Sequence, residues 1–449
     1  MDDKRNIILA VGLTALILFG WPYVAKQFFP TATPPAAQAP ASEQVVSPSD
    51  TGPTADATKG VRPLRQALVE APRVSIETPK LTGSISLKGA RIDDIVLPTY
   101  QQTIKKDSPP IRLFSPGGTK DSYFSGFGWS GDGLKAPGPN TVWTTSGGKL
   151  TPSTPVTLRW DNGQGQIFEI TYAIDNDYMF TVTQKVSNTG TATVGVRPYG
   201  YISHKGVSED PTSWTIHTGP IGVFNGKANY DVDFSDLDED GDTAITSTGG
   251  WIGFTDKYWL SALVPDQKAP VNAKFRKGGE DVYQADFSLN PSLLAPGKTD
   301  SQTSRLFIGA KETKLLERYQ DEGLTLFDRA IDWGWFYWFE KPIFFLLHWL
   351  FGAIGNFGVA IICLTFIVRG LMFPIAQKQF ASMAAMRAVQ PKMKALQEKY
   401  KNDKPRLQQE MMELYRKEKV NPLAGCLPMF LQIPIFFALY KVLMLTIEM

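Results

Sequence analysis

The hydrophobic pattern begins with an apolar segment at the N-terminus. Residues 7–20 are apolar or small, and Trp21 and Tyr23 follow as the aromatic residues expected at the edge of a bilayer. A secretory signal has a core of similar length, but no small-x-small cleavage site follows directly, since Trp21-Pro22-Tyr23 stands there. We expect an uncleaved signal-anchor helix over residues 1–29. Residues 30–73 are rich in Pro, Ala, Thr and Ser, which predicts a disordered tether.

The pattern then changes to a period of two. From residue 74 to about residue 304, segments such as VSIET, GSISL and FEITYAIDNDYMFTVTQKVSN alternate apolar and polar positions, as half-buried strands do. Asn176-Asp177 is a turn signal between two of these strands, and GGWIGFTDKYWLSALVP adds an aromatic strand pair. Many short strands with such turns predict a large antiparallel β-sandwich. With the helix KETKLLERYQ that follows, we place this domain at residues 74–325.

Residues 326–352 carry an unusual density of Trp, Phe and Tyr, interrupted by Glu340, Lys341 and Pro342. Since Trp and Tyr concentrate at headgroup depth, we interpret this segment as an amphipathic helix lying in the membrane interface. The alternative is a buried core helix of the sandwich.

Two later segments are long and apolar enough to span a bilayer. Residues 353–376 cover about 36 Å at ~1.5 Å per residue, against a hydrocarbon core of ~30 Å. Residues 421–446 contain Pro428 and Pro434, and proline is tolerated in a span only where neighbours satisfy the freed carbonyls. We therefore expect this second helix to pack against others.

A basic helical hairpin is predicted between the two spans, over residues 377–420. Its apolar positions recur at intervals of four and three, with KNDKP as the turn, as in a short antiparallel coiled coil. Eleven basic and five acidic residues give this loop a net charge of +6. The positive-inside rule therefore places the hairpin and the N-terminus in the cytoplasm and the sandwich outside, in a multi-pass protein.

Composition excludes several classes of function. Lys and Arg total 46 against 44 Asp and Glu, so the net charge of +2 gives no sign of nucleic-acid specificity. The two cysteines and three histidines cannot form a Cys/His metal cluster. No paired carboxylate or nucleophile lies at telling spacing from His204 or His217, so a structural role is expected for both. We expect neither a catalytic site nor a cofactor.

The run DVDFSDLDEDGD invites a calcium interpretation. Asp236, Asp238, Asp240 and Gly241 fit the first half of an EF-hand loop, but Ser247 stands where the loop needs Glu. A solvated acidic loop without metal is the prediction.

Arg369 is the main candidate site residue, because it lies within the apolar run FIVRGLMFPIA. Arginine stays charged in proteins, and placing it at the bilayer centre costs roughly 2.5–3.5 kcal/mol on insertion scales. Either it snorkels to the interface from the end of the span, or it faces a water-filled cavity inside the membrane. Gln432 on the second span is a candidate polar partner; the alternative is an inter-helix hydrogen bond of structural value.

Two blocks, FGVAIICLTFIVRGLMFPIAQKQFASMAAMRAVQPK and KVNPLAGCLPMFLQIPIFFALYKVLM, closely resemble the YidC family of bacterial membrane protein insertases. The resemblance extends over the whole chain. It implies an inner-membrane protein with a helical membrane bundle, a cytoplasmic hairpin and a periplasmic sandwich similar in fold to mutarotase-like domains.

The resemblance also implies a function and a site. Members of the family insert, fold and assemble nascent membrane proteins through a hydrophilic groove inside the membrane, alone or with the Sec translocon. The arginine that matches Arg369 lies in this groove, and Thr365 and Gln432 are the other candidate groove residues. Implied partners are nascent membrane proteins, the Sec translocon with its accessory subunits, the ribosome and targeting machinery, and the lipid bilayer.

The chain departs from the family pattern in one respect. Members of this type have six spans, and this sequence stops at Met449 after the third, so we expect a fragment. The competing hypothesis is a membrane-anchored periplasmic carbohydrate-binding protein, against which the long basic hairpin argues.

Overall fold

A computed structural model describes residues 61–103, 105, 107–208, 216–334, 337–401, 403–418, 427–445 and 447. The expected signal-anchor helix (1–29) and most of the expected tether lie outside these residues. The tether prediction is corrected at its C-terminal end: Leu64–Val69 forms helix α2, whose Ala67 is buried, and Arg73 already belongs to the first strand.

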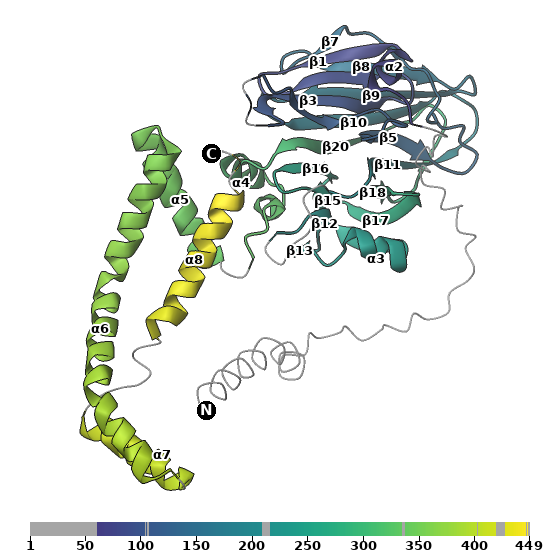
Figure 1. Cartoon of the computed structure of the whole chain (residues 1–449). Helices are drawn as coiled ribbons and strands as arrows, with labels where there is room; N and C mark the ends of the chain where they lie inside the picture. Colours follow the sequence, from purple (N-terminus) through teal and green to yellow (C-terminus); the bar gives the residue numbers. More distant parts are fainter. Residues whose placement is uncertain are drawn as a thin grey trace, which may run out of the picture. The chain divides into compact units, whose positions relative to one another are not determined.

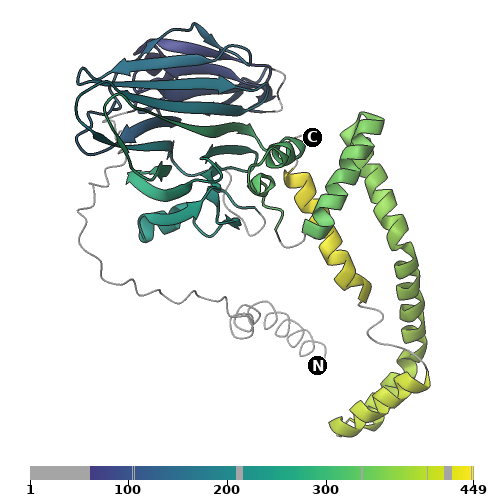
Figure 2. The same cartoon turned by 180° about the vertical axis from the view of Figure 1, so that it is seen from behind.

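Two large sheets form the domain that follows, as Figures 1 and 2 show. The first sheet contains, in spatial order, β14 (Thr243–Thr248), β17 (Pro270–Gly279), β18 (Val282–Leu289), β11 (Val194–Lys205), β5 (Tyr123–Ser130), β3 (Arg91–Gln101), β2 (Thr82–Ser86), β1 (Arg73–Glu77) and β7 (Lys149–Leu150), with β19 (Ser292–Leu294) beside β11 and β4 (Pro110–Phe114) beside β3. The second contains β13 (Lys227–Asn229), β12 (Gly219–Phe224), β15 (Trp251–Thr255), β16 (Trp259–Val264), β20 (Thr299–Ala310), β10 (Met179–Asn188), β9 (Gln166–Ile174), β8 (Val156–Asp161) and β6 (Thr144–Thr145).

The predicted β-sandwich is confirmed, and its pairing is antiparallel except between β1 and β7, which run parallel. The turn signal Asn176-Asp177 lies between β9 and β10, and the aromatic pair is β15 and β16. Side chains also bond across the two sheets. Gln184 of β10 donates to the carbonyl of Gly128 of β5 at 2.8 Å, so the facing layers are held by polar contacts as well as apolar ones.

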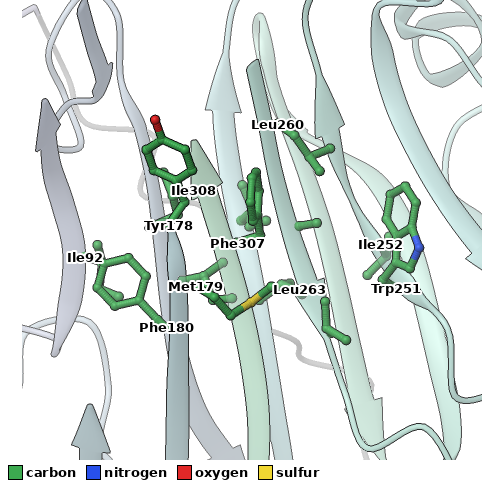
Figure 3. Packing of buried hydrophobic residues seen from close by; sticks show 14 of the residues in the cluster. Ile92, Tyr178, Met179, Phe180, Trp251, Ile252, Leu260, Leu263, Phe307 and Ile308 are labelled. Atoms are coloured by element: carbon green, nitrogen blue, oxygen red, sulfur yellow. The ribbon is translucent and has the colours of Figure 1, made fainter. Parts of the chain in front are cut away.

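The core lies between the sheets, because alternate residues of each strand point inward. In β9 every second side chain, from Phe168 to Ile174, is buried. Figure 3 shows the same packing around Phe307 of β20, whose neighbours include Tyr178 and Met179. Local alternation in the sequence is therefore sufficient to place the inward side chains of β9, whereas Tyr178 and Met179 are adjacent in the chain and are both buried.

The acidic run is a helix rather than the loop that we expected. Phe234–Glu239 forms α3, because Asp233 and Asp236 make a reciprocal capping box at its N-terminus. Asp238 pairs with Lys277 at 2.7 Å and accepts a hydrogen bond from Tyr283. Three of these carboxylates thus have structural partners.

Within the described residues, six helical segments follow the last strand: α4 (Thr313–Asp321), the 3-10 helix η1 (Phe327–Ala330), α5 (Tyr337–Ile354), α6 (Phe357–Lys399), α7 (Lys404–Lys417) and α8 (Leu427–Leu445). The aromatic helix begins later than expected, because η1 and a turn occupy residues 327–334. α5 buries Phe344, Leu347 and Leu350 and exposes Trp338 and Trp349. Such a two-faced helix fits the membrane interface, and that placement stays a prediction.

The predicted span begins at Phe357 rather than at residue 353. Gly355 has a φ of +72°, which breaks the helix after Ile354, and Asn356 caps the next one by accepting from the amide of Val359. Within the described residues, Phe357–Gln377 is the helix long and apolar enough to cross a membrane. The described apolar part of α8, Gln432–Leu445, is shorter, and its first predicted residues, 421–426, lie outside the description.

α6 continues without interruption into the first arm of the predicted hairpin, and α7 forms the second. Val389 is the most buried residue of this seam, and Tyr415 of α7 donates to the sulfur of Met393 at 3.7 Å. The exposed pair Lys392–Glu418, at 2.6 Å, lies beside it. The four-three spacing in the sequence therefore marks the residues at which the two helices meet.

Candidate functional site

Arg369 lies on α6 and faces α8. It is the only charged residue between Phe357 and Gln377. Its guanidinium carbon is 5.5 Å from the ring centroid of Phe436 on α8, a distance at which the cation is attracted to the face of the ring. No acidic side chain pairs with Arg369 among the residues that the structure describes. The charge is therefore free to attract an anionic group from outside this pair of helices.

The two other predicted site residues lie close to this pair along the chain. Thr365 precedes Arg369 by four residues, so both lie on one face of α6, and its hydroxyl donates to the carbonyl of Ile361 at 2.9 Å. Gln432 precedes Phe436 by the same interval on α8 and is partly buried. No hydrogen bond joins Gln432 to Arg369 in the described part of the chain. The contact that the structure shows for Arg369 on α8 is with the ring of Phe436, and the role of Gln432 as a polar partner stays a prediction.

Phe436 and Lys441 are the residues that sequence reasoning missed. The signal for Phe436 was its spacing of four from Gln432, which places both on one face of a helix. The signal for Lys441 was stronger, because it is the only charged residue of α8. The two helices, α6 from Phe357 to Gln377 and α8, thus carry positive charges and no negative one.

The surface of α6 before and after Arg369 is apolar and uncovered. Phe366, Leu371 and Phe373 are 74%, 72% and 58% exposed in the described structure. Apolar side chains at this density require lipid or another polypeptide as a neighbour. A fixed cation next to such a surface can accommodate a segment that has both a charged and an apolar part.

The histidines of the sandwich have structural surroundings. The ring of His204 packs edge-on against Tyr123 at 4.4 Å and also contacts Phe234 and Phe254. His217 is buried, with Nε2 2.7 Å from the carbonyl of Pro220. Burial lowers the pKa of both imidazoles, which keeps them neutral in the apolar core.

Solved structures align with about half of the chain. A galactose mutarotase related enzyme from Lactobacillus acidophilus is 12% identical and has a TM-score of 0.36, with 53% of this chain and 97% of that chain covered. A galactose mutarotase-like protein from Lactobacillus casei is 11% identical with a TM-score of 0.34, with 53% of this chain and 100% of that chain covered.

Sequence comparisons cover the chain from end to end. Residues 73–346 match the family described as the YidC periplasmic domain, and residues 349–449 match the family described as the 60Kd inner membrane protein. The membrane protein insertase YidC of Zymomonas mobilis is 50% identical over 100% of this chain and 78% of that protein. The one from Bradyrhizobium diazoefficiens is 43% identical with the same coverage of both chains. The resemblance found in the sequence is confirmed: the chain belongs to the YidC family of membrane protein insertases.

Proposed function

We propose that this membrane protein insertase moves the polar tail of its substrate past Arg369. Family membership carries the insertase activity. The observation that supports the role of Arg369 is the position of its guanidinium over the ring of Phe436. Arg369 lies on an otherwise uncharged stretch of α6 and has no acidic partner among the described residues. A guanidinium that merely snorkels to the headgroups would have no need of a neighbouring helix.

The physical problem of insertion is the polar tail. Each backbone group that enters hydrocarbon without a hydrogen bond costs several kcal/mol. A water-filled groove that reaches part of the way into the membrane shortens the distance that the tail must cross through hydrocarbon. The water in the groove hydrates the tail over the rest of the way. We assign Arg369, Thr365 and Gln432 to this groove. The proposal also requires that other residues line it.

The charge of Arg369 and the membrane potential set the direction in which the tail moves. Arg369 attracts an acidic tail into the groove, and an inside-negative membrane potential then drives the negative charge outward by about 2.3 kcal/mol per charge per 100 mV. Release into lipid follows from burial of the apolar part of the substrate, at ~25 cal/mol per Å². The uncovered apolar face of α6 lies next to Arg369 and offers a path for that part.

The proposal includes the layout predicted from the sequence. The N-terminus and the basic hairpin (377–420) are cytoplasmic, and the sandwich is periplasmic. Residues 357–376 of α6, the span with its corrected start, and residues 421–446 cross the inner membrane. The Sec translocon, the ribosome and the targeting machinery are proposed partners. A carbohydrate-binding role is not favoured, because residues 349–449 belong to an inner membrane protein family.

The test uses proteoliposomes that contain the protein and substrates with an acidic or a neutral tail. Arg369→Glu should reduce insertion of the acidic substrate strongly and that of the neutral one little, while Arg369→Lys keeps most of both. Arg65→Glu, at an exposed position of α2, is the matched control. Equal insertion of the acidic substrate by the Arg369→Glu and Arg369→Lys variants would refute the role of the charge.

A further inference from the structure

Three ionisable side chains that the proposed function does not use meet at the start of α5. Lys441 of α8 is 2% exposed, and its ammonium lies 3.9 Å from the carboxylate of Asp332, in the turn that precedes α5. Glu340, in the first turn of α5, is fully buried. We call Asp332, Glu340 and Lys441 the junction cluster.

No hydrogen bond accounts for the burial of Glu340 within the described residues. Neither of its carboxylate oxygens has a hydrogen-bond partner within the described residues. Burial raises the pKa of this carboxyl, while Lys441 and Asp332 are near enough to act on it in opposite directions. A carboxylate in such a place is costly unless a cation compensates it, and the ammonium of Lys441 is the one that acts on it.

The turn itself is shaped around Lys441. Gly334 has a φ of +64°, and a Cβ atom at this position would lie 2.6 Å from the ammonium nitrogen of Lys441. Asp332 also accepts a hydrogen bond from the amide of Gly334 at 2.8 Å, which fixes its side chain. The backbone of the turn thus closes directly over the lysine head group, and a larger residue than glycine would displace it.

The cluster extends to the sandwich. Asp332 acts electrostatically on Lys311, a 4% exposed residue just after β20 whose ammonium donates to Thr255 at 2.9 Å. Next to Glu340, Lys341 pairs with Asp328 of η1 at 2.8 Å and with Glu317 of α4 at 3.4 Å. The start of α5 is therefore tied by charge both to α8 and to the segment that leaves the sandwich.

α8 consequently has two different faces. Phe436 is turned to Arg369. Lys441, about 7.5 Å further along the helix axis at ~1.5 Å per residue, is turned to Asp332. Buried charges contribute little net stability, but they discriminate against other packings, because any shift leaves a charge unpaired.

We propose that the junction cluster fixes the C-terminal half of α8 against α5 and the turn after the sandwich, and thereby holds Phe436 in position opposite Arg369 during insertion. Asp332, Glu340 and Lys441 are then positioning residues for the insertion path. This inference rests on the proposed function for its effect on insertion, but the fixed geometry of α8 is a separate and measurable consequence.

The experiment measures geometry and insertion in the same variants of the protein. Both cysteines are replaced by alanine, and spin labels are placed at two exposed positions, Lys149 on β7 and Ile433 on α8. The distance distribution between the labels should be narrow in the parent. It should broaden in Lys441→Met and Asp332→Asn, with insertion reduced on the order of tenfold, since an uncompensated buried charge disfavours the native packing.

Two double variants separate positioning from stability. Exchange of charge, Asp332→Lys with Lys441→Asp, should restore the narrow distribution and part of the insertion. Glu340→Met with Lys441→Met removes both fully buried charges and leaves only the partly exposed Asp332 without its partner, so a cluster that serves stability alone would keep both the narrow distribution and the insertion. We expect this variant to broaden the distribution and to lose insertion.

The inference is overturned if the single variants keep the narrow distribution, or if the distribution broadens while insertion is unchanged. It is also overturned if insertion is lost without a change in distance. Glu340→Gln keeps the shape of the side chain. It replaces any variant that does not fold in the distance and insertion measurements. If the parent itself fails to insert the substrate, the proposed function fails, whereas the distances still test the cluster.

Discussion

The guanidinium of Arg369 lies over the ring of Phe436, with 5.5 Å between its central carbon and the ring centroid. The whole basic hairpin lies between these two residues in the sequence. An aromatic face holds a cation without neutralising it, which a carboxylate at the same place would do. Arg369 is thus kept in position and remains available to an acidic substrate.

This relationship predicts a role for the ring. Phe436→Leu should reduce insertion of an acidic-tailed substrate by about two- to fivefold, equivalent to the ~0.5–1 kcal/mol of a cation–π contact. Phe436→Tyr keeps the aromatic face and should insert nearly as well as the parent. Ile433→Leu, at an exposed position on the same helix, is the control in the proteoliposome assay. Unchanged insertion by Phe436→Leu would contradict the prediction.

A second prediction concerns the sandwich and the segment that leaves it. The ring of Phe307 is fully buried and contacts Tyr178, Tyr319 of α4 and Phe327 of η1, with centroids 5.9, 6.0 and 5.5 Å away. Phe307→Ala should lower the free energy of unfolding by about 3–5 kcal/mol, because it leaves a cavity among these rings. Denaturant unfolding followed by near-UV circular dichroism measures the change.

The control for that variant is Leu293→Ala, because Leu293 is 82% exposed. Its effect should stay within about 0.5 kcal/mol. Similar losses in the two variants would show that the aromatic cluster does not join the sandwich to α4 and η1.

The hairpin allows a comparison between packing and surface charge. Val389 is 4% exposed in the seam, so Val389→Ala should destabilise the hairpin by about 1–2 kcal/mol through lost apolar burial. Lys392→Ala removes an exposed ion pair with Glu418 and should cost less than about 0.5 kcal/mol. Hydrogen exchange of the amides in α7 reports both changes. A larger effect for Lys392→Ala would mean that charge rather than packing holds the hairpin.

The features that the sequence predicted well are local. Alternation over a few residues sets which face of β9 is buried, and a spacing of four and three marks Val389 and Met393 as seam residues. The capping box of α3 could also be predicted from the sequence, because Asp233 and Asp236 are three residues apart and precede the apolar Leu237. The repeated aspartates by themselves indicate a loop, which is why the loop prediction is wrong here.

The features that could not be predicted join residues distant in the chain. Nothing in the run around Arg369 indicates that a phenylalanine of a later helix will meet it. In the same way, Lys441 and Asp332 become neighbours only because α8 packs on α5 and the turn before it. Such contacts depend on how whole helices pack, which a period of apolar positions does not specify.

The pH dependence of stability follows from Lys311, which is 4% exposed. Burial lowers the pKa of its ammonium to about 8, although Asp256 and Asp332 oppose this shift. Between this value and the ordinary pKa of about 10.4, the unfolded chain holds the proton and the folded protein does not, so stability rises with pH. The full effect of this group is about 3 kcal/mol and is complete only above the ordinary pKa.

The measurement is thermal or denaturant unfolding of the full chain between about pH 7.5 and 9.5. This window lies above the range in which the buried histidines titrate, which is near and below their ordinary pKa of about 6.5. It also lies below pH 10, where tyrosines of the unfolded chain ionise and the raised pKa of the buried tyrosines begins to lower stability. Lys311→Met should remove the upward slope, whereas Lys185→Met, at an exposed position, should keep it. A slope of the same size in the Lys311→Met variant would show that another group is responsible.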